Sequence, residues 1–253
     1  MDINGKTLIV TGGGQGLGRA MAIELAGAGA NLALIDLNED PLNEAVQLCK
    51  QAGGDARAYK GNVAIEEEVI SIFDAIEADS GEIHGLINNA GILRDGLLVK
   101  VKDGQVEKRM SLAEWQAVID VNLTGVFLCG REAATRMIQK KVPGCIINIS
   151  SISKAGNMGQ SNYSAAKAGV AAMATVWAKE LARYGIRAAG IAPGFIATDM
   201  VASMKPEALE KMAAGIPLKR LGEPREVAHT ARFILENDYI SGRVIELDAA
   251  LRI

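Results

Sequence analysis

Tyr163 and Lys167 are the residues whose types and spacing most directly suggest chemistry. They lie four positions apart in an alanine-rich run, residues 162–184, that predicts a helix, so both side chains project from one helix face. A phenol has a pKa of about 10 and exchanges protons poorly at neutral pH. A neighbouring cation lowers such a pKa by roughly 1 to 3 pH units. Lys167 could therefore make Tyr163 an acid–base catalyst, although the same spacing also suits an exposed pair on an ordinary helix.

A glycine-rich turn near the N-terminus predicts a site for phosphate groups. The glycines follow an apolar run at residues 6–10 and precede a helical pattern at residues 19–28. Glycines allow a tight turn and close approach to a pyrophosphate, and a helix N-terminus adds free N–H groups and a positive dipole end. The spacing is G-x-x-x-G-x-G rather than the G-x-G-x-x-G fingerprint, so a purely structural turn is the alternative. The predicted phosphate-binding residues are Gly12, Gln15, Gly16, Leu17 and Gly18.

Asp36 is a candidate for binding a ribose. It ends the next apolar run, residues 31–35, which begins about 20 residues after the glycine turn, where an acidic residue binds ribose hydroxyls and repels a 2′-phosphate. This position favours NAD(H), while Arg19, which could contact a 2′-phosphate, keeps NADP(H) open. A loop residue or a helix cap is the alternative for Asp36, and Asn38 suits the cap better.

Strand and helix patterns alternate along the whole chain. This alternation predicts βαβ units and therefore an α/β fold with a parallel sheet. Only 4% of the residues are aromatic although 49% are apolar, so the core must be built from aliphatic side chains, as in sheets covered on both faces. A length of 253 residues suits one domain of this class. The predicted strands are residues 6–10, 31–35, 56–60, 83–87, 145–149, 186–191 and 244–247, and the main predicted helices are residues 19–28, 41–51, 66–79, 111–139 and 162–184.

Composition argues against several other classes of protein. The net charge is −3 with mixed signs, which gives no footprint for a nucleic acid. Cys49, Cys129 and Cys145 are far apart in the sequence, so reduced thiols in the cytoplasm are expected. The N-terminus lacks the apolar region of a signal peptide, and no uncharged apolar run reaches membrane-spanning length. No His, Cys or carboxylate cluster has the spacing of metal ligands, so no metal is expected.

Three motifs together resemble the short-chain dehydrogenase/reductase family. They are Thr11-Gly12-x3-Gly16-x-Gly18, Asn88-Asn89-Ala90-Gly91 and Tyr163-x3-Lys167, in the order and spacing of the single-domain members. The resemblance covers essentially the whole chain and is strongest to the β-ketoacyl-(acyl-carrier-protein) reductase group. It implies a Rossmann-like three-layer sandwich, a seven-stranded parallel sheet in the order 3-2-1-4-5-6-7, one NAD(P)-binding domain over residues 1–253, and a homotetramer.

The resemblance also implies roles for individual residues. Lys167 would hold the nicotinamide ribose, and Asn122 would hold a water that links this lysine to solvent. A serine after the fifth strand would hydrogen-bond the substrate carbonyl. Strand register points to Ser151, whereas counting back from Tyr163 points to Ser150, and we choose Ser151 because register is held more tightly than loop length. The backbone of Ile196 and the hydroxyl of Thr198 would bind the carboxamide. The remaining cofactor residues would be Asn62, Val63, Asn89, Ala90, Gly91, Tyr163, Lys167, Pro193 and Gly194.

Two segments leave alternatives open. Residues 197–216 include Met200, Met204 and Met212 and resemble the mobile substrate lid of the family, although a simple surface helix fits as well. Residues 99–110 form a segment longer than in many relatives. A hairpin around residues 100–106, a rim of the substrate mouth and a solvated loop all fit, and we favour the loop. Relatives also carry glycine pairs after the last strand, where this chain has Asp248-Ala249-Ala250.

The expected reaction is hydride transfer between a nicotinamide cofactor and a 3-oxoacyl or 3-hydroxyacyl thioester, or a related ketone or secondary alcohol. Arg136, Lys140 and Lys141 offer a basic surface for an acyl carrier protein, whereas Tyr184, where such enzymes often have arginine, and Asp36 argue against that partner. The alternatives are a catalytically silent nucleotide-binding scaffold and an NAD-dependent secondary-alcohol dehydrogenase unrelated to acyl carriers. An epimerase or dehydratase of the extended branch fits less well, because no substrate domain follows.

Overall fold

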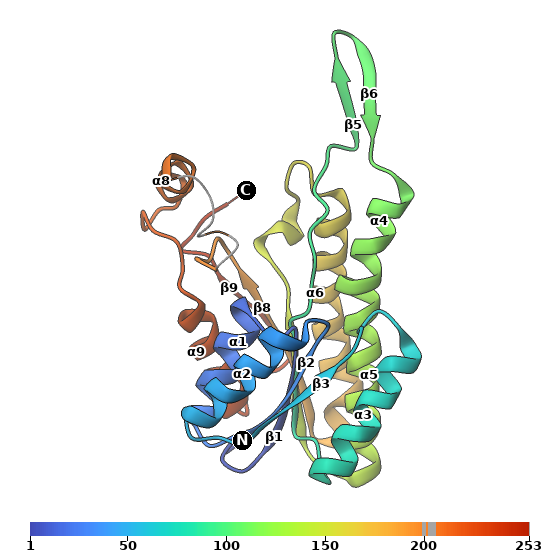
Figure 1. Cartoon of the computed structure of the whole chain (residues 1–253), viewed down its shortest axis with the longest axis vertical. Helices are drawn as coiled ribbons and strands as arrows, with labels where there is room; N and C mark the ends of the chain where they lie inside the picture. The colour runs from blue at the N-terminus through green and yellow to red at the C-terminus, as the bar shows by residue number, and fades with distance from the viewer. Residues whose placement is uncertain (199–200, 202–205, 253) are drawn as a thin grey trace.

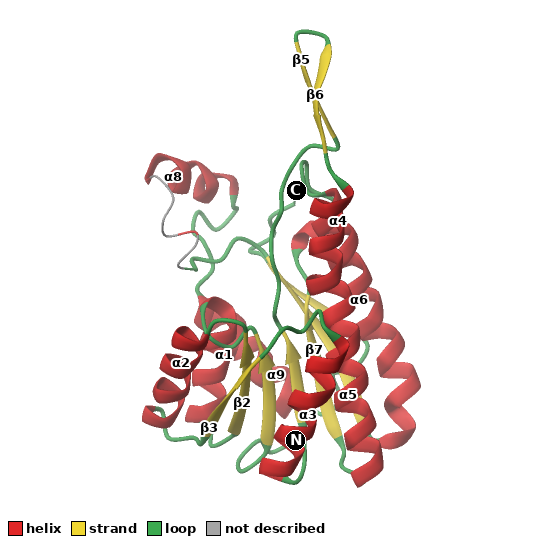
Figure 2. Ribbon diagram, turned by 45° about the vertical axis from the view of Figure 1, so that its right-hand side comes forward, coloured by secondary structure: helices red, strands yellow, loops and turns green. Residues whose placement is uncertain are grey.

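A computed structural model describes residues 1–198, 201 and 206–252 of the chain. Seven parallel strands form one sheet in the order β3-β2-β1-β4-β7-β8-β9 (Figures 1 and 2). Since β7, β8 and β9 are the fifth, sixth and seventh of these strands along the chain, the predicted order is confirmed. The strands are β1 (Thr7–Thr11), β2 (Asn31–Asp36), β3 (Ala56–Lys60), β4 (Gly85–Asn88), β7 (Gly144–Ile149), β8 (Ile186–Pro193) and β9 (Val244–Leu247).

Helices cover both faces of the sheet, so the three-layer arrangement is also confirmed (Figure 1). On one side lie α1 (Gly16–Gly27), α2 (Glu39–Gln51) and α9 (Pro224–Glu236); on the other lie α3 (Glu66–Ser80), α5 (Gly125–Lys140) and α6 (Ser161–Leu181). Alternate residues of β1 pack on opposite faces of the sheet. Leu8 and Val10 belong to the core on the α1 side, and Ile9 belongs to the core on the α3 side. A strand that packs on both faces must be apolar throughout, which explains its continuous aliphatic run.

The predicted helix at residues 111–139 is interrupted in its middle. Its two α-helical parts, α4 (Leu112–Ile119) and α5, are joined by a π-helical turn at Asp120–Thr124. Ser111 caps α4 as the sequence indicated, because its hydroxyl accepts the Glu114 amide at 3.1 Å while the Glu114 carboxylate accepts the Ser111 amide at 2.8 Å. The π-turn contains Asn122, and such turns often mark functional positions.

The solvated loop that we favoured for residues 99–110 is wrong, because this segment forms an antiparallel hairpin. Its strands are β5 (Val99–Lys102) and β6 (Gln105–Arg109). The turn between them consists of Asp103 and Gly104, whose φ angles are 50° and 74°. Asp-Gly is a preferred pair for two-residue hairpin turns that need positive φ at both positions. The hairpin projects well beyond the rest of the chain (Figures 1 and 2).

The remaining helices are shorter. They are the 3₁₀ turns at Ile152–Ala155 and Ala182–Tyr184 and the helix α8 (Pro206–Gly215), which lies away from the sheet in Figure 1. Within the described ranges, no helix is both long enough and apolar enough to cross a membrane.

Candidate active site

The glycine turn and the Asn-Asn-Ala-Gly segment are held together by Thr11. Its hydroxyl accepts hydrogen bonds from the backbone N–H groups of Asn89 and Ala90, each at 3.0 Å. In the opposite direction, the Asn89 side-chain nitrogen donates hydrogen bonds to the carbonyls of Thr11 and Gly12, each at 3.1 Å. The ends of β1 and β4 are therefore joined into one surface. We assigned Thr11 no role from the sequence, although a hydroxyl at the end of a strand was the available signal.

The geometry of the glycine turn fits a pyrophosphate. Gly12 and Gly16 have φ angles of 63° and 53°, which favour glycine. A Cβ atom on Gly18 would lie 1.9 Å from the carbonyl oxygen of Gly12, so no other residue fits there. Gln15 precedes α1 without capping it, and the first turn of α1 has no acidic residue. Because Gln15 does not cap them, the first N–H groups of this helix can bind an anion.

Asp36 lies against this turn. One carboxylate oxygen accepts the Gly14 amide at 3.0 Å, and the other accepts the Asn38 amide at 3.1 Å. The Gly61 amide donates to the Asp36 carbonyl at 3.0 Å, which brings the following residues, Asn62 and Val63, to the same edge of the sheet. A carboxylate beside a phosphate-binding turn suits a dinucleotide whose ribose carries free hydroxyls. These residues therefore fit a nicotinamide dinucleotide.

The segment after β8 approaches the same turn. Pro193 ends β8, and a Cβ atom on Gly194 would lie 2.9 Å from the Cα of Asp248. The Thr198 methyl group lies 3.9 Å from the Cβ position of Gly16, while Ile196 is buried. In the proposed lid, Met200 and Met204 lie outside the described residues, and Met212 is a half-buried residue of α8.

Ser151 rather than Ser150 lies beside Tyr163. The Ser151 hydroxyl hydrogen-bonds the Tyr163 phenol and also accepts the Ser153 amide at 3.1 Å. Ser150 points elsewhere, because its buried hydroxyl donates to the Lys167 carbonyl at 2.8 Å. Strand register was thus the better guide to which serine faces the tyrosine.

The pKa of Tyr163 is raised above its usual value by the protein alone. Burial is the main cause, the hydrogen bond from Ser151 acts in the opposite direction, and the negative charge of Asp95 adds to the increase. We expected Lys167 to lower this pKa. In the structure, its ammonium group lies 5.5 Å from the centre of the Tyr163 ring but donates its hydrogen bond, at 2.8 Å, to the Ile149 carbonyl.

The surroundings of Lys167 disfavour the charged form of its side chain. Its side chain is buried, and burial lowers its pKa to about 8, because removing an ammonium group from water disfavours the charged form. A lysine with a pKa near 8 can exchange protons near neutral pH, which a solvated lysine cannot do. This property suits a proton relay next to Tyr163.

This burial predicts a specific dependence of stability on pH. The pKa of Lys167 is about 8 in the folded protein and near 10.5 when unfolded, so between these pH values the unfolded chain binds more protons. Relative to a Lys167→Met variant, the wild-type free energy of unfolding should therefore rise from pH 8 to 10.5, by on the order of 3 kcal/mol. Urea unfolding at several pH values measures the difference. Lys179→Met, on an exposed position of the same helix, is the control, and parallel curves for wild type and Lys167→Met would contradict the expectation.

Asn122 is buried, and its side-chain amide forms two hydrogen bonds to one residue. Its oxygen accepts the Ile92 amide at 2.8 Å, and its nitrogen donates to the Ile92 carbonyl at 3.0 Å. The π-turn thus holds the chain directly after Gly91, next to the predicted cofactor surface. The side chain supports this segment and keeps one N–H and one oxygen lone pair for a further partner.

Asn162 is a residue of this site that sequence reasoning missed. It is buried, and its side-chain nitrogen donates to the carbonyls of Arg94 and Glu114 at 3.0 and 3.2 Å. Its oxygen accepts the amide of Tyr163 at 2.8 Å. It therefore ties the first turn of α6 to α4 and to the segment after β4. The only signal was an amide directly before the tyrosine.

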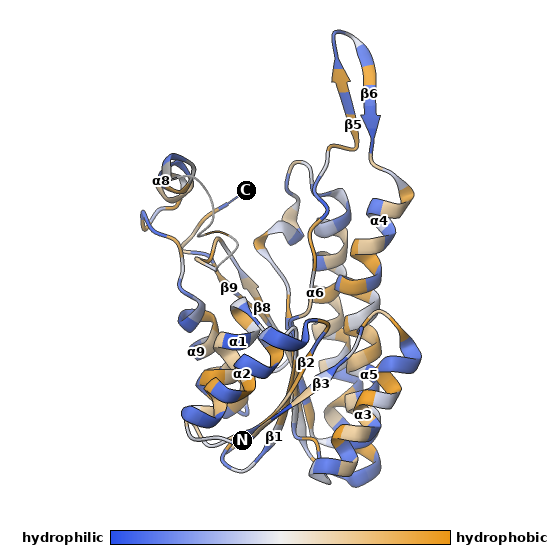
Figure 3. Ribbon diagram, in the orientation of Figure 1, coloured by the Kyte–Doolittle hydropathy of each residue, from blue (hydrophilic) through white to orange (hydrophobic). Residues whose placement is uncertain are grey.

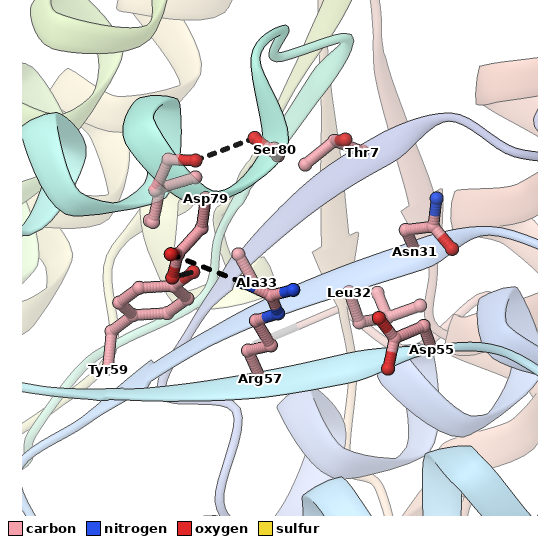
Figure 4. A pocket seen from close by; sticks show the side chains of 10 residues that line it. Thr7, Asn31, Leu32, Ala33, Asp55, Arg57, Tyr59, Asp79 and Ser80 are labelled. Carbon is pink, nitrogen blue, oxygen red and sulfur yellow. Dashed lines mark hydrogen bonds and ion pairs between the residues drawn. The ribbon is translucent and has the colours of Figure 1, made fainter.

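The pocket in Figure 4, of about 200 Å³, lies at the other end of the sheet. It is bordered by the starts of β1 and β2, by β3 and by the end of α3. Two of its charged groups are paired with each other, because Asp79 contacts Arg57 at 3.2 Å and also accepts from the Tyr59 hydroxyl at 2.8 Å. Parallel sheets bind ligands at the carboxyl ends of their strands, so this pocket is not the candidate site. Among the described residues, no three His, Cys, Asp or Glu side chains are placed to hold a metal ion.

Arg136 does not offer the basic surface that we expected for a carrier protein. It is only 6% exposed, stacks over the Phe73 ring and forms ion pairs with Asp74, Glu77 and Glu132. Lys140 contacts Glu77 as well, at 3.4 Å. Of the three expected basic residues, only Lys141 is exposed without an ion pair to a described residue.

Comparison with known proteins agrees with the fold. The sequence profile described as short chain dehydrogenase matches residues 6–209. A 3-oxoacyl-[acyl-carrier-protein] reductase of Thermotoga maritima is 38% identical over 99% of both chains, and one of Synechocystis is 41% identical over 98% of both. A crystal structure of a putative gluconate dehydrogenase from Agrobacterium tumefaciens superimposes with a TM-score of 0.88 at 36% identity, covering 98% of this chain and 96% of that one.

A Rossmann-like sheet with a glycine turn at its carboxyl edge defines a dinucleotide-binding oxidoreductase. With a profile match over residues 6–209 and full-length relatives at 38–41% identity, the chain belongs to the short-chain dehydrogenase/reductase family of NAD(P)-dependent enzymes.

Proposed function

We propose that the protein reduces the ketone of a 3-oxoacyl thioester, or oxidises the corresponding alcohol, with Tyr163 as the general acid and base. The observation that carries this proposal is the group formed by Ser151, Tyr163 and Lys167, in which a half-buried phenol is hydrogen-bonded to a serine and lies next to a buried lysine. A protein that only binds nucleotides has no need for this arrangement. We further infer that residues 1–253 act as one nicotinamide-binding domain, because one sheet joins residues 7 to 247.

In the proposed reduction, the nicotinamide supplies the hydride when it is bound. Ser151 donates a hydrogen bond to the substrate carbonyl oxygen, and Tyr163 transfers its phenolic proton to that oxygen as negative charge develops there. Lys167, with its pKa near 8, then returns a proton toward the tyrosine. Asn122 and Asn162 keep the surrounding segments in place. In the oxidation, each proton moves in the reverse direction.

The proposed cofactor is NAD(H). Its pyrophosphate would bind at the glycine turn, where Gly12 and Gly18 permit the close packing of the turn and Gly16 leaves space, and Asp36 would bind the adenosine ribose. The nicotinamide ribose would be held by Tyr163 and Lys167, and the carboxamide by Ile196 and Thr198. Further contacts would come from Gln15, Leu17, Asn62, Val63, Asn89, Ala90, Gly91, Pro193 and Gly194. A carboxylate at residue 36 is unfavourable to the 2′-phosphate of NADP(H).

The test is the reduction of acetoacetyl-CoA, followed by the nicotinamide absorbance, with NADH and NADPH in parallel. We expect turnover that favours NADH. Turnover with NADPH alone would keep the reaction but contradict the cofactor assignment. Cofactor binding without turnover, in either direction and on a panel of secondary alcohols, would instead favour a nucleotide-binding scaffold.

A second candidate is an NAD-dependent dehydrogenase of small secondary alcohols unrelated to acyl carriers. Two observations favour it: Arg136 is neutralised by its ion pairs, and one structurally similar protein is named a putative gluconate dehydrogenase. An acyl carrier protein remains the proposed partner only if thioesters are turned over. We place the enzyme in the cytoplasm as a homotetramer, supported by three free, buried cysteines and by analogy with the family.

A further inference from the structure

The β5–β6 hairpin has one mainly apolar face and one charged face. Val101 lies opposite Val106, and Val99 is two residues from Val101, so these three side chains share one face, which also carries Arg109 opposite Val99. Lys100, Lys102, Gln105 and Lys108 occupy the other face, where Lys100 pairs with Glu107 at 2.9 Å. This alternation is typical of a strand pair with one face packed on protein and the other in water.

Nothing in the described part of the same protomer covers the valine face. Every residue from 97 to 109 is exposed, and Val99, Val101 and Val106 are 45%, 58% and 60% exposed. The two strands pair only with each other, outside the main sheet. Figure 3 shows apolar positions along both strands of the hairpin, far from the core. Two-stranded hairpins are marginal in water without a packed face, yet this one stands away from the body.

The apolar surface continues at the base of the hairpin. Leu97, Leu98 and Leu112 are 46%, 67% and 77% exposed, and the Met110 amide closes the base by donating to the Leu98 carbonyl at 3.1 Å. The segment that enters the hairpin is also bonded to the catalytic helix and the loop before it, because Gly96 donates to the Gly159 carbonyl at 2.8 Å and Asn162 donates to the Arg94 carbonyl. The hairpin is thus an arm rooted at the active site.

We propose that the valine face of this arm packs against a second copy of the same chain. An exposed apolar strand pair promotes aggregation unless it is covered. A transient partner, such as a carrier protein, would leave it bare for most of the time, whereas another copy of the chain is always present in the same amount. The arm also extends outside its own protomer, so it can reach a neighbour without any change of fold. The inference is independent of the substrate proposed above.

The test compares substitutions on the two faces of the arm in the full chain. The apolar-face variant combines Val99→Thr, Val101→Thr and Val106→Thr, which keep the β-branched shape. The matched control combines Lys100→Thr, Lys102→Thr and Gln105→Thr on the charged face. Sedimentation equilibrium over a range of concentrations should show that the apolar-face variant dissociates at concentrations at least tenfold higher than wild type, or loses one assembly step. The control should keep the wild-type mass, and circular dichroism should show the same fold in all three.

Two further measurements test whether the arm itself lies in the interface. In the first, Leu98 is joined to Met110 through Gly-Gly, which removes the arm. The two joined residues are already hydrogen-bonded to each other, so the fold should be kept, and assembly should weaken as in the apolar-face variant. Because Cys49, Cys129 and Cys145 are buried, a single introduced thiol can be followed: in the oligomer, Val101→Cys should react with a thiol reagent at least tenfold more slowly than Lys102→Cys.

A monomeric wild type, an unchanged mass in the apolar-face and arm-deleted variants, or equal thiol reactivity would overturn the proposal. An unchanged mass together with a higher KM for carrier-bound thioesters alone would overturn it in favour of a carrier protein on this face.

Discussion

Replacing Tyr163 with Phe should lower kcat by about 10²- to 10⁴-fold, the contribution that a positioned acid–base group makes. Phe keeps the ring but has no proton to give, so the alkoxide that forms during ketone reduction is left without a donor. Since the ring still packs as before, cofactor binding, measured by nicotinamide fluorescence, should change little. Steady-state reduction of the best thioester or ketone, with NADH and at fixed pH, measures the effect.

Tyr184→Phe is the matched control, because Tyr184 lies just beyond the same helix, is 40% exposed and belongs to no part of the candidate site. It should retain wild-type kcat. If Tyr163→Phe also retained it, Tyr163 would not be the proton donor. If the wild type bound cofactor but turned over no substrate, the scaffold alternative would gain support.

The same assay decides between the two serines. Ser151→Ala should reduce kcat strongly, because it removes a hydrogen bond to the reacting oxygen and to Tyr163. Ser150→Ala should act mainly on stability, because its hydroxyl is bonded to the Lys167 carbonyl at 2.8 Å. The opposite pattern would show that our choice of Ser151 is wrong.

The fold was accessible from the sequence because its signals are local and repeated. Aliphatic runs such as the one in β1 mark strands that are buried on both faces, and the glycines at 12, 16 and 18 mark a turn that only glycine permits. The strand order came from the family resemblance, since periodicity alone does not specify which strands are neighbours. The hairpin was the less favoured alternative although Asp103-Gly104 is a strong turn signal, because its strands pack on nothing in the described part of their own protomer.

Electrostatics at the site could not be read from the sequence. Burial, which spacing does not report, raises the pKa of Tyr163 and lowers that of Lys167 to about 8. Arg136 shows the same limit, because its ion-pair partners Asp74 and Glu77 lie on another helix, about sixty residues away in sequence and next to it only after folding.

The turn after β9 contains two alanines with positive φ angles. Where relatives have glycine pairs, Ala249 and Ala250 adopt φ angles of 52° and 64°, in a region that costs a residue with a Cβ about 1–2 kcal/mol. Asp248 holds this turn, because its carboxylate accepts the Ala250 amide at 2.9 Å and pairs with Arg252 at 2.8 Å. The positive φ angles of these two alanines are thus supported by side-chain bonds that the sequence did not reveal.

Asp36→Asn should shift the ratio of kcat/KM for NADH to that for NADPH by about 100-fold toward NADPH, because two like charges in contact cost several kcal/mol. Asparagine keeps the shape and an acceptor for the Gly14 amide, so the change isolates the charge. Asp36→Ala should shift the preference in the same direction but also destabilise the protein, because the Gly14 and Asn38 amides lose their acceptor.

Asp40→Ala is the charge-matched control, since this carboxylate is exposed on the first turn of α2 and should leave the preference unchanged. Dissociation constants for NADH and NADPH, measured by fluorescence without substrate, separate binding from turnover. Equal ratios in wild type and Asp36→Asn would show that this carboxylate does not select the cofactor. A wild type that already prefers NADPH would mean that Asp36 turns away from the ribose on binding, with its charge compensated nearby, and Arg19 would then be the next residue to replace.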